Sequence, residues 1–182
     1  MSGSGWDVFG TLHAVPALDR PDLLAEPVAV ALKEIDADRV GVAEIDPDLA
    51  DTAAFCETYD SPLEKSANCV VVAGKRSGEV RYAACLVLAT TRADVNGAVK
   101  RRLDVRKASF APMDEAVAAT GMAYGGITPI GLPADWPVWI APGVVEAGEV
   151  VIGSGTRNGK LAVPADLLTA LPNATVVDDL VR

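Results

Sequence analysis

Histidine is nearly absent from this 182-residue sequence, in which His13 is the only one. Catalytic Ser-His-Asp and Cys-His arrangements need a histidine beside the nucleophile, and a residue so near the N-terminus is a poor candidate. Cysteine is also scarce: Cys56, Cys69 and Cys85 are too few for a disulfide framework and lack the close pairing of a zinc site. We therefore expect no bound metal and no cofactor.

Long apolar runs are missing as well. No stretch approaches the roughly 18 residues that a membrane span requires, and the N-terminus lacks the basic and apolar regions of a signal peptide. Half of the residues are hydrophobic but only 5% are aromatic, which indicates an interior of Val, Ala and Leu. We expect a cytoplasmic protein with no membrane partner, folded as a single domain over residues 1–182, with residues 1–18 as a mobile N-terminal arm.

Basic residues are outnumbered by acidic ones, which gives a net charge of −9, but they are concentrated in one segment. Residues 65–107 contain 10 basic and 3 acidic side chains, whereas residues 1–64 contain 3 and 14, and residues 108–182 contain 3 and 8. This asymmetry favours the docking of a polyanion on one face, although a solvated helix face would give the same pattern. The central basic residues are Lys100, Arg101, Arg102, Arg106 and Lys107.

Hydrophobic periodicity and turn residues predict an α+β fold. Two apolar segments separated by turn residues 74–78 should form a hairpin at the centre of the sheet, and Asp46 should cap a helix. Neighbouring strands pair more than they alternate with helices, which favours a mixed, mostly antiparallel curved sheet or partial barrel flanked by helices. The expected helices are 21–35, 46–59, 94–103, 113–121 and 164–171, and the expected strands are 39–45, 67–73, 79–90, 138–140, 149–153 and 160–163.

The heptapeptide Gly125-Gly126-Ile127-Thr128-Pro129-Ile130-Gly131 places three glycines around a Thr-Pro pair. Glycine has no Cβ and proline fixes φ, so this pattern predicts a stiff, exposed backbone. Its amides would suit carbonyl, carboxylate or phosphate oxygens as ligands. An ordinary double turn between strands is the alternative. A second glycine turn, Gly153-Ser154-Gly155, follows a strand, and Asn158-Gly159 leads into another, which indicates a β-hairpin rather than a dinucleotide loop.

Thr120-Gly121 followed by this heptapeptide resembles the glycine-glycine-(Ile/Val)-(Ser/Thr)-Pro-x-Gly signature of the YbaK/prolyl-tRNA synthetase-associated domain family. The resemblance covers about residues 65–170. It implies a YbaK-like α+β fold and trans-editing, the hydrolysis of wrongly charged aminoacyl-tRNA. It also implies two partners, the acceptor end of aminoacyl-tRNA and an aminoacyl-tRNA synthetase.

The resemblance further implies a site built around the glycine segments. Its catalytic residues would be Asn68, Thr128 and Gly131, with amides of the heptapeptide polarising the ester carbonyl or holding the terminal ribose. The basic cluster of residues 100–107 would meet tRNA phosphates. The expected substrate-binding residues are Lys65, Gly125, Gly126, Ile127, Pro129, Gly153, Ser154 and Gly155.

Asn68 departs from the family pattern, which usually has a lysine at this strand position. An amide can still hydrogen-bond the ribose or carbonyl, and Lys65 could reach the same pocket. Asn68 could instead cap a loop, and Thr128 could only stabilise its own turn. The resemblance thus implies an aminoacyl-tRNA deacylase that removes a small mischarged amino acid from tRNA, selected by pocket size. The alternatives are a non-catalytic module that binds an aminoacyl-tRNA, a nucleotide or a synthetase, and an acidic interaction domain.

Overall fold

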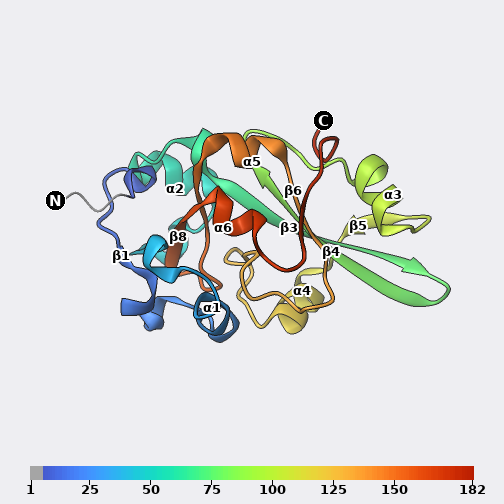
Figure 1. The fold of residues 1–182 in the computed structure, drawn as a ribbon, viewed down its shortest axis with the longest axis horizontal. Helices are drawn as coiled ribbons and strands as arrows, with labels where there is room; N and C mark the ends of the chain where they lie inside the picture. Colours follow the sequence, from blue (N-terminus) through green and yellow to red (C-terminus); the bar gives the residue numbers. More distant parts are fainter. Residues whose placement is uncertain (1–5) are drawn as a thin grey trace.

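The computed structural model describes residues 6–182 and contains two β-sheets with helices packed around them (Figure 1). One sheet has the order β1-β2-β8-β7 and is antiparallel throughout. The other has the order β5-β3-β4-β6-β9, in which only the β4–β6 and β6–β9 pairs are parallel. The expected α+β class and mostly antiparallel pairing are confirmed. The strands are β1 (Val15–Pro16), β2 (Gly41–Glu44), β3 (Ala67–Arg76), β4 (Glu79–Leu88), β5 (Ala108–Phe110), β6 (Val138–Ile140), β7 (Glu149–Gly153), β8 (Gly159–Pro164) and β9 (Ala174–Val176).

The β3–β4 hairpin is the longest pair in the described part of the chain, and its turn projects at the right of Figure 1. The sequence placed the turn at residues 74–78, but both strands continue to a tight turn at Ser77 and Gly78. Gly74 pairs with Arg81 inside the hairpin. A Cβ there would lie 2.7 Å from the backbone oxygen of Lys107, so glycine serves the close approach of β5 rather than a turn.

The expected helices are present but shorter. Residues 21–35 divide into a 3₁₀ turn and α1, because the amide of Ala25 donates to the backbone oxygen of Ser154 instead of continuing a helix. Asp46 caps only a 3₁₀ turn, and Asp51 caps the helix that follows, accepting from the amides of Ala53 and Ala54. The helices are α1 (Glu26–Leu32), α2 (Thr52–Tyr59), α3 (Lys100–Leu103, after a π-helical turn at Val95–Val99), α4 (Met113–Thr120), α5 (Pro142–Ala147) and α6 (Ala165–Thr169).

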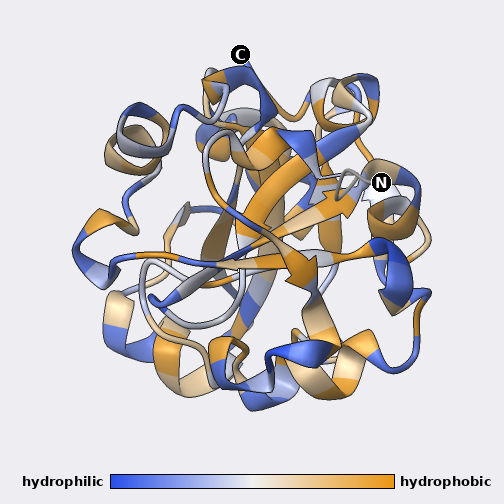
Figure 2. Ribbon diagram, turned by 90° about the vertical axis from the view of Figure 1, so that its left-hand side faces the viewer, coloured by the Kyte–Doolittle hydropathy of each residue, from blue (hydrophilic) through white to orange (hydrophobic). Residues whose placement is uncertain are grey.

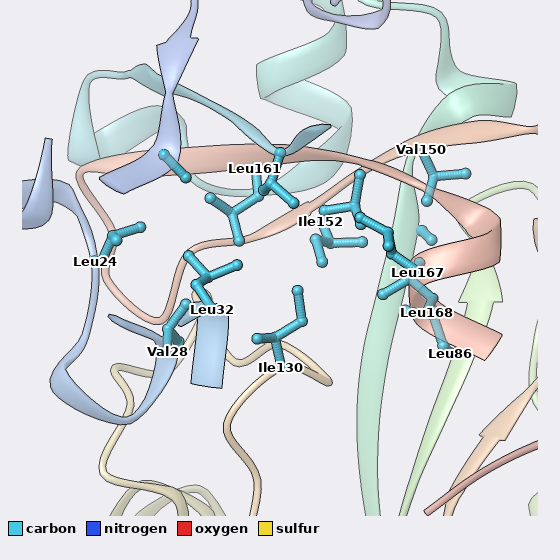
Figure 3. Close-up of a cluster of buried hydrophobic side chains, with 14 of the residues drawn as sticks. Leu24, Val28, Leu32, Leu86, Ile130, Val150, Ile152, Leu161, Leu167 and Leu168 are labelled. Carbon is cyan, nitrogen blue, oxygen red and sulfur yellow. The ribbon is translucent and has the colours of Figure 1, made fainter. Parts of the chain in front are cut away.

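The main core lies between α1, α6 and the two sheets, where side chains from distant segments converge (Figure 3). Ile130 of the glycine heptapeptide is fully buried there, close to Val28 and Leu32 of α1. Figure 2 shows the same division, with apolar strands in the middle and polar segments on the outer helices. The side chain of Ile130 therefore anchors the heptapeptide in the core.

The N-terminal segment also packs onto the domain. Phe9 is fully buried beside Phe55 of α2, and β1 pairs with β2. The first five residues of the expected arm lie outside the described residues. Between residues 6 and 182, no helix is long and apolar enough to cross a membrane.

Candidate functional site

A cavity of about 630 Å³ opens where the two sheets meet. An isolated parallel bridge between Ser66 and Val151 joins the sheets beside it. Its walls come from the segment that leads into α2, the first half of β3, the turn before the heptapeptide and the paired ends of β7 and β8. The polar side chains in the lining include those of Asp51, Thr52, Asn68 and Lys160.

Asn68 lies on β3 and is half-buried in this wall. Its Oδ1 accepts a hydrogen bond of 2.7 Å from the hydroxyl of Thr52 at the start of α2. This bond fixes the orientation of the amide, since the hydroxyl donates to the oxygen. Both hydrogens on Nδ2 have no acceptor within residues 6–182 and are available to a ligand oxygen.

Lys160 lies on β8, directly opposite Gly153 of β7, and only 7% of the residue is exposed. Its Nζ donates to the backbone oxygen of Ala50 at 2.9 Å and lies 5.4 Å from the ring centroid of Phe55. Burial lowers the pKa of this amine from its usual value, because the charged form loses hydration. The sequence did not point to Lys160, since a lysine after an Asn-Gly turn looks like the exposed start of a strand.

Cys69 is the only thiol in the lining of this cavity. Burial raises the pKa of the Cys69 thiol well above its ordinary range, and nearby Cys85 adds to the shift. Burial also raises the pKa of Cys85 to about 12. A thiol rather than a thiolate therefore faces the cavity at neutral pH, which makes it a poor nucleophile.

The two glycine segments that the sequence singled out lie against each other. Gly126 donates to the oxygen of Ala123 and accepts from the amide of Gly155 at 2.7 Å. A Cβ on Gly126 would lie 2.4 Å from the backbone oxygen of Thr156. Gly125, Ile127 and Gly153 line the cavity, and the amides of Gly125 and Ile127 donate to no acceptor in the described chain. The glycines thus allow two backbones to meet at the wall of the cavity.

The rest of the heptapeptide points away from the cavity. Thr128 is fully buried, and its hydroxyl has no hydrogen-bond partner among residues 6–182. Pro129 is also buried. Gly131 adopts a positive φ of 94°, and a Cβ there would lie 2.6 Å from the carbonyl oxygen of Pro27 in α1. Thr128, Pro129 and Gly131 therefore lie outside the lining, and the absence of a side chain at Gly131 allows the segment to approach α1 closely.

Two other expected binding residues are engaged elsewhere. Lys65 donates through Nζ to the backbone oxygen of Ala147 at the end of α5 and does not line the cavity. Ser154 is fully buried, and its hydroxyl donates to the oxygen of Gly159 inside the β7–β8 turn. Lys160 is consequently the lysine that the fold brings to the wall beside Asn68.

The basic cluster lies around α3, where all its members are exposed except Lys100, which is half-buried. Arg101 pairs with Asp179 at 3.1 Å, whereas the other four basic side chains make no ion pair within the described residues. A second cavity of about 570 Å³ shares Asn68, Val70 and Phe110 with the first. It also contains Arg92 and Arg182. Positive side chains thus continue from the surface to the edge of the candidate site.

Metal-binding geometry is absent from the part of the chain that the structure describes. No group of three or more His, Cys, Asp or Glu side chains is placed to hold an ion within residues 6–182.

The chain belongs to the aminoacyl-tRNA editing domain family, whose model matches residues 46–171. A candidate trans-editing enzyme for prolyl-tRNA synthetase has a similar fold, with a TM-score of 0.73, 23% identity, and coverage of 87% of this chain and 96% of that protein. A hypothetical protein, APE2540, gives a TM-score of 0.71, 19% identity, and coverage of 86% and 100%. At these identities the likeness shows the fold. No curated protein gives a significant match.

Proposed function

We propose that this protein is an aminoacyl-tRNA deacylase that hydrolyses a small mischarged amino acid from tRNA in trans. The observation that carries the proposal is the cavity at the junction of the sheets, which places hydrogen-bond donors beside a small apolar wall. Its volume lies in the range of small-molecule sites. Membership of the editing-domain family supports hydrolysis of an aminoacyl ester as the reaction, and the donors in the cavity lining suit such an ester.

An aminoacyl ester is already activated, so the protein has to hold its carbonyl and admit a water. Nδ2 of Asn68 and the amides of Gly125 and Ile127 are the donors available to the ester carbonyl or to the terminal ribose. Water adds to the carbonyl carbon, and the bond from that carbon to the ribose oxygen breaks. One proton of the water ends on the ribose oxygen, and the other leaves to solvent. Because burial keeps the Cys69 thiol protonated, attack by this thiol on the ester is not part of the proposed reaction.

Asp51 is the carboxylate in the cavity lining. Its Oδ1 accepts from two amides at the start of α2, which leaves Oδ2 available. An aminoacyl ester carries a cationic α-ammonium group, and a carboxylate at the cavity wall is a suitable partner for it. Ala67, Val71, Ala116 and Ile127 supply apolar surface for a short side chain. This arrangement favours a small amino acid over a large one by steric exclusion.

The acceptor end of the tRNA would approach over Phe110, which is 64% exposed at the boundary of the two cavities. An exposed aromatic ring is a stacking surface for an unpaired terminal base. Arg92 and Arg182 in the second cavity, and the basic cluster beyond, would then meet phosphates.

The test is release of labelled amino acid from tRNAs charged with alanine, serine, cysteine or proline, by the wild-type protein, Asn68→Ala and Asn68→Lys. We expect wild-type turnover on at least one ester and a loss of about 10²-fold in Asn68→Ala. Binding without turnover by the wild type, with turnover appearing in Asn68→Lys, would instead establish the non-catalytic module. Binding of neither charged nor uncharged tRNA would overturn both.

A further inference from the structure

We propose that Lys160 is the cation of this site and that its ammonium group contacts the acyl carbonyl oxygen of the bound ester, stabilising the oxyanion that forms there. This role rests on the proposed deacylase function and names a residue for it. Lys160 comes from β8, far along the chain from the strand position at which the family resemblance leads one to expect a lysine.

The ammonium group of Lys160 has unused donors and no charged partner. A lysine ammonium has three N–H donors, and within residues 6–182 the Nζ of Lys160 uses only one, to the backbone oxygen of Ala50. No carboxylate forms an ion pair with it in that part of the chain, although the residue is only 7% exposed. A buried, unpaired charge costs folding free energy, and such a group is retained where it binds something.

The position of Lys160 also suits this role. Lys160 and Asn68 hold the same short segment from two different sheets: Lys160 bonds the carbonyl of Ala50, and Asn68 bonds the hydroxyl of Thr52. All four residues line one cavity. The amine of Lys160 and the amide of Asn68 therefore reach the same short segment at the cavity wall.

Two other cations near the cavity, Arg157 and Lys65, are committed to backbone oxygens. Arg157 donates to the backbone oxygens of Tyr124 and Pro47 and is exposed. Lys65 donates to the backbone oxygen of Ala147 and lies outside the lining. Among the residues that line the cavity, Lys160 alone carries a positive charge.

The electrostatic setting favours an interaction that strengthens during the reaction. The groups that act on the amine are Asp51 and Cys56, from the start and the body of α2, and Arg157, from the β7–β8 turn. Burial is the largest effect and the pKa of Lys160 is lowered overall, although Cys56 and Asp51 raise it, while Arg157 lowers it further. In such a poorly hydrated site, a cation stabilises a developing oxyanion more than a neutral carbonyl, so its effect should fall mainly on kcat.

The experiment compares the wild type with Lys160→Met, Lys160→Arg and the double variant Lys160→Met/Asn68→Lys. We expect Lys160→Met to lower kcat by about 10²–10³-fold with little change in KM, and the double variant to recover much of that loss. Far-UV circular dichroism and urea unfolding would verify that each variant folds. Lys33→Met, on the exposed end of α1, is the matched control.

A pH profile separates a functional cation from a structural one. In the wild type, after subtraction of spontaneous ester hydrolysis, kcat should fall with rising pH as Lys160 loses its proton, below the usual lysine range. In Lys160→Met this limb should be absent, and in Lys160→Arg it should move to higher pH because a guanidinium stays charged. An unchanged rate and an unchanged limb in Lys160→Met would overturn the inference while leaving the deacylase function intact.

A binding measurement covers the case of no turnover. The probe is alanyl-adenosine joined by a non-hydrolysable 3′-amide, which retains the carbonyl oxygen. If the wild type hydrolyses no ester but binds this probe about tenfold more tightly than Lys160→Met does, the deacylase function fails and the contact of Lys160 stands. Equal affinity in that case would overturn the inference as well.

Discussion

A Cβ atom on Gly153 would lie only 2.4 Å from the carbonyl oxygen of Gly126. The two glycines belong to separate turns, and their contact brings the end of β7 against the segment that begins the heptapeptide. Both turns therefore share one wall of the cavity because neither carries a side chain at the point of contact. A substitution at either position should affect folding and activity together.

Gly153→Ala is expected to destabilise the protein by about 1–3 kcal/mol, because the methyl group meets backbone atoms that cannot move aside as a side chain would. Urea unfolding measures the change. Gly78→Ala, at the exposed turn of the β3–β4 hairpin, is the control: it meets nothing within 4 Å and strains only a positive φ. Deacylation should fall in the first variant and stay unchanged in the second. Equal activity in both would remove the shared wall from the site.

Thr52→Val removes the hydroxyl that fixes Asn68 and keeps nearly the same shape. We expect the rate of deacylation to fall by about tenfold, since an amide free to rotate is a poorer donor. Single-turnover release of labelled amino acid would measure it. Thr58→Val, on the exposed face of the same helix, makes the matched change away from the cavity and should leave the rate alone. A Thr52→Val variant with wild-type rates would show that Asn68 needs no such support.

Thr128→Val tests a residue to which the family resemblance gives a catalytic role. Its buried hydroxyl has no partner in the described chain, so replacing it with a methyl group removes an uncompensated desolvation cost. We expect stability to rise by about 1 kcal/mol and deacylation to remain at the wild-type level. Loss of activity with the fold intact would instead return Thr128 to the site.

Charge reversal at Arg102 and Arg106 should weaken tRNA binding. These two side chains are exposed and make no ion pair within residues 6–182, so they are available for phosphates. In a plot of log affinity against log salt, the slope should become shallower by about one unit for each phosphate that the variant no longer neutralises. Lys33→Glu alters the charge equally on another helix. If it weakens binding as much as Arg102→Glu, net charge rather than the basic cluster is responsible.

Lys160 also makes stability depend on pH. Its pKa is lower in the folded state than in the unfolded chain, so between the two values the unfolded state binds more protons and stability rises with pH. Lys160→Met lacks this buried amine, so its free energy of unfolding should exceed that of the wild type. The difference should be largest near pH 7 and shrink toward about pH 10. Urea unfolding across this range would measure it, with Lys33→Met as the baseline for losing one amine. If the difference in unfolding free energy stays constant across this pH range, folding does not change the pKa of the Lys160 amine.

Local signals in the sequence were sufficient for the fold class and most elements. The apolar, β-branched runs of β3 and β4 and the Asn-Gly turn before β8 act over a few residues, so they can be read directly from the chain. The helix expected at residues 21–35 was too long, because the backbone of Ala25 bonds to Ser154, a contact that no local pattern contains. The short strands β1, β5 and β9 were missed for the same reason, since pairing with distant strands defines them.

The candidate site was only partly predictable. Asn68, Gly125, Ile127 and Gly153 do meet at one cavity, but glycine spacing could not distinguish a backbone that lines a site from one that packs against a helix, as Gly131 does. Lys160 was missed because its burial depends on α2 covering one face of β8, which is a tertiary contact.

The bridge between Ser66 and Val151 has a consequence for discrimination among amino acids. The cavity lies at the junction of the two sheets, beside this bridge. The distance between the sheets therefore sets the width of the cavity, more than any one lining side chain does. Related proteins could thus accept a wider or narrower range of amino acids through changes at this junction, with the hydrogen-bond donors of the cavity unchanged.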